Sequence, residues 1–89
     1  MLYTKEHAAT VHQTLANRYG NDDAVDAAIV FDVCGNVCSY AKRFMDGHVD
    51  VVNVNNALYM TSSKRINNTP SMFVALVAEF GSGFRYVAA

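Results

Sequence analysis

The sequence has few charged residues and no cluster of one sign. Charged side chains make up 17% of the 89 residues, against about 25% in a typical soluble domain. Seven basic and eight acidic residues are spread along the chain rather than gathered into runs. Such a chain has no electrostatic footprint for nucleic acid or anionic lipid, so we expect neither as its ligand.

Long apolar runs and recognisable targeting segments are also lacking. No run approaches the roughly 18–20 apolar residues that cross a bilayer, and the first ten residues, MLYTKEHAAT, lack the apolar core of a secretory signal. We therefore expect a cytoplasmic protein with no membrane contact. In that compartment the two cysteines of the chain are expected to be reduced thiols rather than a structural disulfide.

Motifs that carry chemistry are missing as well. The glycine-serine-glycine run at 81–83 follows a predicted helix instead of opening one, so it lacks the helix N-terminus that holds a phosphate. His7 and His12 are five residues apart, which does not stack them on one helical face as a metal pair. We expect no cofactor, no bound metal and no catalytic activity.

What is present predicts a single α+β domain over residues 1–89. Apolar residues at helical spacing predict a helix from Lys5 to Tyr19, capped by Thr4 and ended by Gly20. β-Branched and aromatic residues between turn signals then predict an antiparallel meander of three to four strands. The expected strands are 28–34, 37–45, 48–54 and, less clearly marked, 57–61. A second helix over 70–80, closed by Gly81, and a short last strand within 84–88 complete the fold.

The only two cysteines flank a glycine-asparagine pair in the stretch VCGNVCS, residues 33 to 39. Gly35 followed by Asn36 is typical of a two-residue type II′ turn. That turn places Cys34 and Cys38 on opposite faces of the sheet, Cys38 toward the core, because side chains alternate along a strand. A three-residue loop over 35–37 would instead bring the two thiols opposite each other and allow a disulfide.

Two-residue turns at Asp46-Gly47 and Asn55-Asn56 extend this register across the sheet. They predict a direct ion pair between Arg43 and Asp50. They also collect the large apolar residues on one face, against which we expect both helices to pack in a two-layer fold. That predicted core face holds Ile29, Phe31, Val33, Cys38, Tyr40, Phe44, Val49 and Val51.

The other face of the predicted sheet is half apolar. It carries a cross-strand row of Val30, Ala41, Val52 and Tyr59, and a contiguous apolar row is rarely left exposed to water. The second helix, PSMFVALVAEF, is apolar nearly all round, whereas a surface helix shows one apolar stripe. It must be covered on more than one side, by the rest of the monomer or by another subunit.

These observations indicate a small non-enzymatic protein-interaction module that regulates or inhibits a larger protein, of the kind common among phage and plasmid accessory products. With 52% apolar residues in so short a chain, association with a protein partner or as a homodimer is expected. The predicted contact surface combines the apolar row, a charged rim and the polar loop 61–69, which often carries specificity. Its residues are Val30, Ala41, Arg43, Asp50, Val52, Tyr59, Ser63, Lys64 and Arg65.

Two other functions stay open at this point. A module for single-stranded nucleic acid would depend on Lys64 and Arg65 and would bind less tightly as salt rises. A small enzyme or ligand-binding subunit would have its site completed across a dimer interface.

Overall fold

A computed structural model describes residues 5–20 and 22–88 of the chain. Its five strands form one antiparallel sheet in the order β4-β3-β2-β1-β5, so the first four strands are a meander and the last returns beside the first. The cap expected at Thr4 lies outside the described residues. The elements are α1 (Lys5–Tyr19), β1 (Ala24–Phe31), β2 (Val37–Phe44), β3 (Val49–Val54), β4 (Met60–Ile66), α2 (Met72–Phe80) and β5 (Arg85–Ala88).

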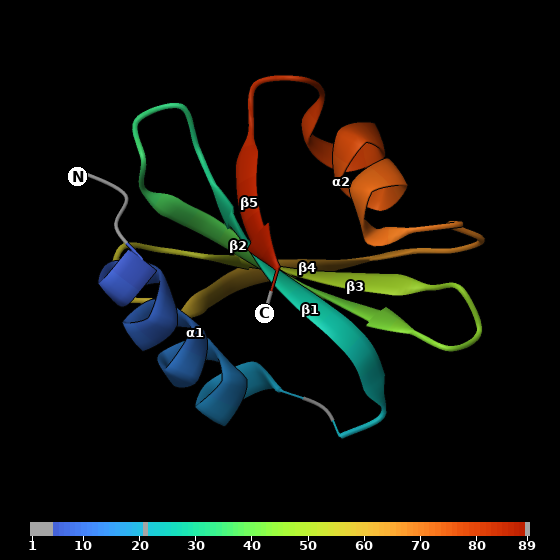
Figure 1. Cartoon of the computed structure of the whole chain (residues 1–89), viewed down its shortest axis with the longest axis horizontal. Coiled ribbons are helices and arrows are strands. Elements are labelled where there is room, and N and C mark those ends of the chain that lie inside the picture. The colour runs from blue at the N-terminus through green and yellow to red at the C-terminus, as the bar shows by residue number, and fades with distance from the viewer. Residues whose placement is uncertain (1–4, 21, 89) are drawn as a thin grey trace.

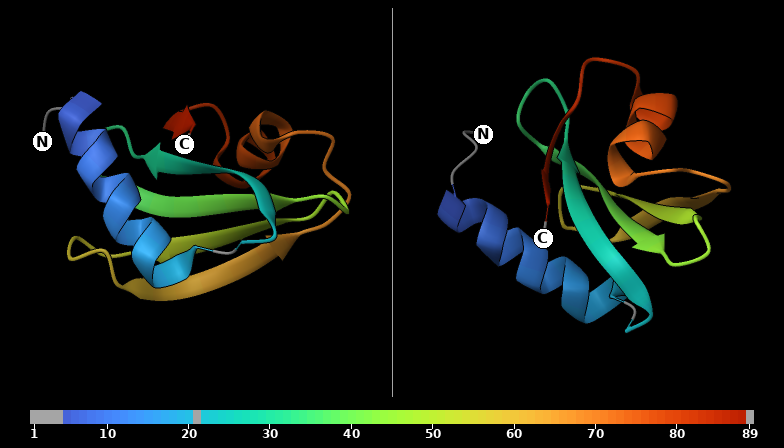
Figure 2. Two further views of the ribbon diagram at one scale, coloured as in Figure 1. Left: turned by 60° about the horizontal axis from the view of Figure 1, so that its bottom comes forward. Right: turned by 45° about the vertical axis from the view of Figure 1, so that its right-hand side comes forward.

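The predicted α+β fold is confirmed in the kinds and the order of its elements, including the short last strand. The two helices, however, lie on opposite sides of the sheet (Figure 1; Figure 2). The expectation that both helices pack on the Ile29/Phe31 face in two layers is therefore wrong. The molecule has a helix, a sheet and a second helix as three successive layers.

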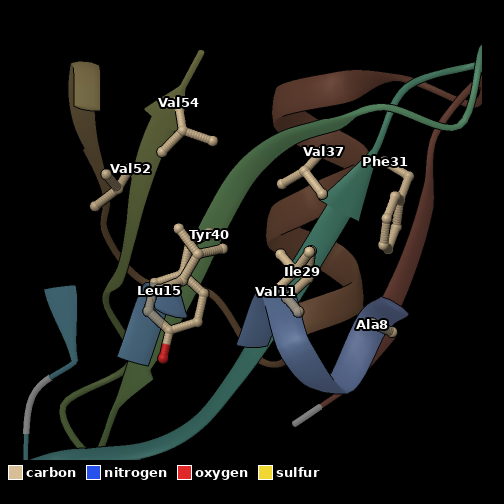
Figure 3. Close-up of a cluster of buried hydrophobic side chains, with 9 residues drawn as sticks. All are labelled: Ala8, Val11, Leu15, Ile29, Phe31, Val37, Tyr40, Val52 and Val54. Atoms are coloured by element: carbon tan, nitrogen blue, oxygen red, sulfur yellow. The ribbon is translucent and has the colours of Figure 1, made fainter. Parts of the chain in front are cut away.

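The α1 layer packs as its sequence pattern predicts. Ala8, Val11 and Leu15, spaced by three and four residues, point onto the face of the sheet that carries Ile29 and Tyr40 (Figure 3). Leu15 is fully buried in this cluster. The remaining buried members of the α1 cluster are Phe31, Val37, Val52 and Val54.

The α2 layer covers the other face. Ala75 and Leu76 are fully buried and form the underside of the helix. Its N-terminus is capped by Ser71, whose hydroxyl accepts a hydrogen bond from the N–H of Val74, and its C-terminus ends at Gly81 with φ +74°. The residues of the sheet beneath it are Ala28, Val30, Ala41, Val49 and Val51.

The three hairpin turns share one conformation. In each, the residue before the loop and the residue after it are joined by a backbone hydrogen bond around three loop residues. The third loop residue has positive φ: +84° at Gly35, +92° at Gly47 and +66° at Leu58. Three-residue hairpin loops with a left-handed last residue are a common alternative to two-residue turns. The two-residue turns expected from Gly35-Asn36, Asp46-Gly47 and Asn55-Asn56 are therefore wrong.

Side chains stabilise two of these turns in the same way. The Asp32 carboxylate accepts hydrogen bonds from the N–H groups of Cys34 and Asn36. The Asn55 amide oxygen accepts from those of Ala57 and Tyr59. An Asp or Asn side chain that binds the backbone two residues on fixes the start of a turn. In these two hairpins the loop therefore begins one or two residues away from the expected position.

The β2–β3 turn decides which faces become apolar. The loop holds Met45 as well as Asp46 and Gly47, so Arg43 pairs with Val49 rather than with Asp50. A shift of one residue exchanges the two faces of a strand. Val49 and Val51 consequently lie under α2, while Val52 and Val54 lie under α1. Both faces are then apolar, and each needs a helix.

The strand boundaries differ from the expected ones mainly at β4. The polar stretch 61–69, expected to be a loop, supplies most of β4, which pairs with β3 from Val49–Ile66 to Val54–Met60. The strand expected over 57–61 is thus displaced toward the C-terminus. β1 begins at Ala24, inside the segment expected to be a connector, and ends at Phe31.

Replacing Gly47 with alanine is expected to lower the free energy of unfolding by about 1–2 kcal/mol, because an L-residue at φ +92° is strained. Steric contact adds little, since the new Cβ would lie 3.5 Å from the Thr69 carbonyl oxygen. Gly83 is a matched control: its φ is ordinary and a Cβ there would meet only a Val33 methyl at 3.7 Å. Urea denaturation of both variants checks this, and equal effects at the two glycines would contradict the turn assignment.

Candidate protein-binding surface

The structure does not form the exposed apolar row that the sequence predicts. Val30 and Ala41 are fully buried beneath α2. Val52 is 6% exposed and belongs to the α1 cluster on the opposite face. Only Tyr59 of the four is exposed, at 56%, in the loop before β4. The predicted row is wrong for two reasons: α2 covers the face of Val30 and Ala41, and the one-residue difference in the β2–β3 register moves Val52 to the other face.

The charged rim is also arranged differently from the prediction. Arg43 donates to the Asp26 carboxylate across β1 and β2, at 2.9 Å. Asp50 accepts from the Arg65 guanidinium at 2.9 Å, on the neighbouring strand β4. The expected pair of Arg43 with Asp50 is therefore wrong, and the two residues belong to separate ion pairs.

The residues expected in a polar loop, Ser63, Lys64 and Arg65, lie on the edge strand β4 and are exposed. The Lys64 ammonium lies 2.9 Å from the Glu79 carboxylate of α2. Each of the two basic side chains is thus within an ion pair of its own chain, one on either face of the sheet. These contacts place both residues at the rim of the molecule.

A hollow of about 490 Å³ between the end of α1 and strands β3 and β4 contains several cations. Arg18 donates to backbone carbonyls of the β3–β4 loop and stacks over the Tyr59 ring at 4.2 Å. Lys42 is 6% exposed and donates to the Tyr19 carbonyl oxygen at the end of α1. Burial lowers the pKa of the Lys42 ammonium, with Asp50 opposing the shift. Arg18 and Lys42 thus link α1 to the sheet, while Lys64 and Arg65, which also line the hollow, form ion pairs with Glu79 and Asp50.

The two thiols have separate environments and form no disulfide, as expected. Cys34 is exposed in the β1–β2 loop, while Cys38 is half-buried on β2. Cys38 packs against the α2 cluster, so its expected place on the Ile29/Phe31 face is wrong. Burial raises the pKa of the Cys38 thiol, which disfavours the thiolate that nucleophilic catalysis needs.

Histidine and carboxylate groups meet at the β2–β3 loop, which is the end of β2 away from the cysteine loop. His48 stacks on Phe44 with ring centroids 4.3 Å apart, and its Nδ1 lies 2.5 Å from the Asp46 carboxylate. Because β2 runs between this end and the cysteine loop, His48 and Cys34 are separated by on the order of 20 Å.

Among residues 5–20 and 22–88, no three His, Cys, Asp or Glu side chains gather in a way that could hold a metal ion. None of the described helices combines the length and apolar character needed to cross a membrane.

Exposed apolar side chains gather instead on the outer side of α2 and on β5. Phe73, Val74 and Val77 are 55%, 45% and 41% exposed, and Tyr86 is 37% exposed. We refer to these four residues as the α2–β5 patch. Side chains of this size with such exposure present on the order of 300 Å² of apolar surface. A patch of that extent on a small protein is often a contact site.

Aromatic rings make the patch continuous between the two elements. The ring of Phe73 on α2 lies 6.3 Å from that of Tyr86 on β5. Tyr86 in turn lies 6.0 Å from Phe84, which lies 5.9 Å from Phe80 at the end of α2. Phe80 and Phe84 are half-buried against the α2 cluster. The exposed rings are therefore anchored on a rigid base rather than carried by a loose loop.

None of the patch residues is among the contact residues predicted from the sequence. A signal for them is nevertheless present, because the second helix is apolar nearly all round. The structure covers only its underside, at Ala75 and Leu76.

Comparison of the chain with protein-family models, with curated proteins and with solved structures finds no match.

Proposed function

We propose that this protein is a small non-enzymatic interaction module that binds another protein and regulates or inhibits it. The α2–β5 patch is the observation that carries the proposal. Its four residues are uncharged, side by side and mounted on a packed helix and a strand. Aromatic residues at the centre of an uncharged patch are typical of protein-protein contacts.

The charge distribution favours a protein over a nucleic acid as the ligand. Lys64 and Arg65, on which a nucleic-acid site would depend, face the carboxylates of Glu79 and Asp50. Binding a phosphate backbone would require these cations to leave their partners, and the net charge of −1 supplies no long-range attraction. The apolar patch has no such competing partner among the described residues.

Replacing Val77 with glutamate is expected to weaken binding of the partner protein strongly, because a carboxylate would be placed within the apolar patch. Val77 is 41% exposed, so the fold should tolerate the change. The measurement is affinity capture from a lysate of the native host, with mass spectrometry of the proteins retained. We expect at least a tenfold loss of the retained partner, equivalent to about 1.4 kcal/mol.

Met45 provides a matched control, since it is 88% exposed in the β2–β3 loop, away from the patch. The Met45→Glu variant carries the same added charge and should retain the same proteins as the wild type. Equal retention by all three proteins, or no specific retention by the wild type, would contradict the proposal.

A further inference from the structure

The two edges of the sheet differ in how they are protected. Edge strands offer unpaired N–H and C=O groups, and natural proteins often guard them with charged side chains. β4 follows this rule, because Lys64 and Arg65 stand near its end, each with an acidic partner. β5 carries a single charge, at Arg85, and no ion pair of the described residues involves it.

The unguarded edge adjoins the apolar patch. Tyr86 of β5 contacts Phe73 of α2, so the side of the helix nearest this edge is aromatic and exposed. A cavity of about 270 Å³, lined by Phe31, Arg85, Tyr86 and Val87 among others, lies beside the same strand. The helix side nearest β4 instead carries the Glu79–Lys64 ion pair. At the β5 edge, an edge strand without a neighbouring strand thus lies next to the exposed apolar side chains of the α2–β5 patch.

We infer that a second copy of this chain covers the β5 edge, with the two β5 strands paired antiparallel about a two-fold axis at Tyr86. The inference rests on the proposed function in one respect, that the α2–β5 patch is a protein contact. The two sheets would then continue into each other, with the α2 helices of both copies on the same side.

The register follows from the faces of β5. Directly opposed residues of an antiparallel pair share a face. Tyr86 points to the α2 side and Val87 to the α1 cluster. Tyr86 can therefore oppose Tyr86 of the other copy, which sets two aromatic rings beside each other between the two Phe73 rings. Arg85 then opposes Val87, so the arginines of the two copies lie at opposite ends and do not repel.

The area of the α2–β5 patch favours an occupant that also pairs with the backbone of β5. A stable interface covers about 800 Å² on each partner, whereas the four patch side chains present on the order of 300 Å². An occupant that contacts only the patch would bind weakly. A second β5 with its own patch supplies strand pairing and apolar contact together, by a self-complementary use of one surface.

The test exchanges charges at the two-fold axis. Wild-type protein should show twice the chain mass by light scattering at high concentration and dissociate on dilution. Tyr86→Glu and Tyr86→Lys should each weaken the dimer at least about tenfold, because like charges face each other across the axis. An equimolar mixture of the two variants should regain the dimer, since glutamate then faces lysine. Tyr59 is also exposed and lies outside the α2–β5 patch, so Tyr59→Glu should dimerise as the wild type does.

Three outcomes would overturn the inference. They are a wild type that stays monomeric at every concentration, single variants that dimerise unchanged, and a mixture that stays monomeric although circular dichroism shows both variants folded. If the variants do not fold, the wild-type mass alone decides. A monomeric wild type that still captures a host protein through Val77 would refute the second copy and leave the proposed function intact. A dimeric wild type that captures no host protein would support the second copy and refute the proposed function.

Discussion

Replacing Leu76 with alanine is expected to lower the free energy of unfolding by about 2–5 kcal/mol. Leu76 is fully buried in the cluster between α2 and the sheet, which also contains Ala41, Val49 and Val51. Truncation removes its apolar contacts and leaves a cavity that a packed core closes only in part. For a small domain with a total stability of about 5–15 kcal/mol, this is a large fraction.

The neighbouring Val77 supplies the control for this variant on the same helix. Because Val77 is 41% exposed, Val77→Ala should change the stability by less than about 1 kcal/mol. Urea denaturation followed by circular dichroism measures both. If Val77→Ala cost as much as Leu76→Ala, the orientation of α2 on the sheet would be different from the one described.

Replacing Leu15 with alanine is expected to cost a similar amount, about 2–5 kcal/mol, on the other side of the sheet. Leu15 is fully buried between α1 and the residues around Tyr40 (Figure 3). The two buried leucines belong to separate clusters, so each helix covers its own face and neither can replace the other.

Gln13 on the same helix is exposed and bonds only to the nearby Asn17 side chain. Gln13→Ala should therefore change the stability by no more than about 0.5 kcal/mol. The same denaturation measurement applies. A loss below about 1 kcal/mol for Leu15→Ala would mean that α1 does not pack on the sheet as described.

The kinds and the order of the elements were predictable from the sequence, but their packing into layers was not, and that difference comes from one residue in the β2–β3 loop. Alternation along β2 and β3 is visible in the sequence, whereas the length of the turn between them is not. With Met45 inside the loop, Val49 and Val51 turn to the face of Val30 and Ala41. Asp46-Gly47 suits a two-residue turn as well as the last two positions of a three-residue loop. Only the pairing of the strands distinguishes them.

The edge strand β4 was expected too early in the chain, at 57–61 instead of Met60–Ile66, for a different reason. Its residues from Met60 to Arg65 are exposed. Because neither face of this stretch is buried, its sequence shows no alternation of apolar and polar residues. The strand exists because its backbone pairs with β3. A rule based on side chains cannot detect such a strand, and the same polar residues are typical of loops.

The candidate site was half predictable. An apolar helix indicates that some contact lies beyond its own sheet, and the sequence shows this for residues 70–80. Which side of the helix stays open depends on where β5 lies and on the Phe73–Tyr86 contact. These are tertiary contacts between residues distant in the chain, which local patterns do not contain.

Hydroxyl-radical footprinting with mass spectrometry tests most directly whether the α2–β5 patch is a protein contact. Phe73, Tyr86 and the control Tyr59 are all exposed in the single chain and can be read in one sample. The protein would be labelled when dilute, when concentrated and when bound to the captured partner. We expect Phe73 and Tyr86 to be protected in an associated state while Tyr59 stays reactive. Unchanged reactivity of Phe73 and Tyr86 in every state would contradict the account.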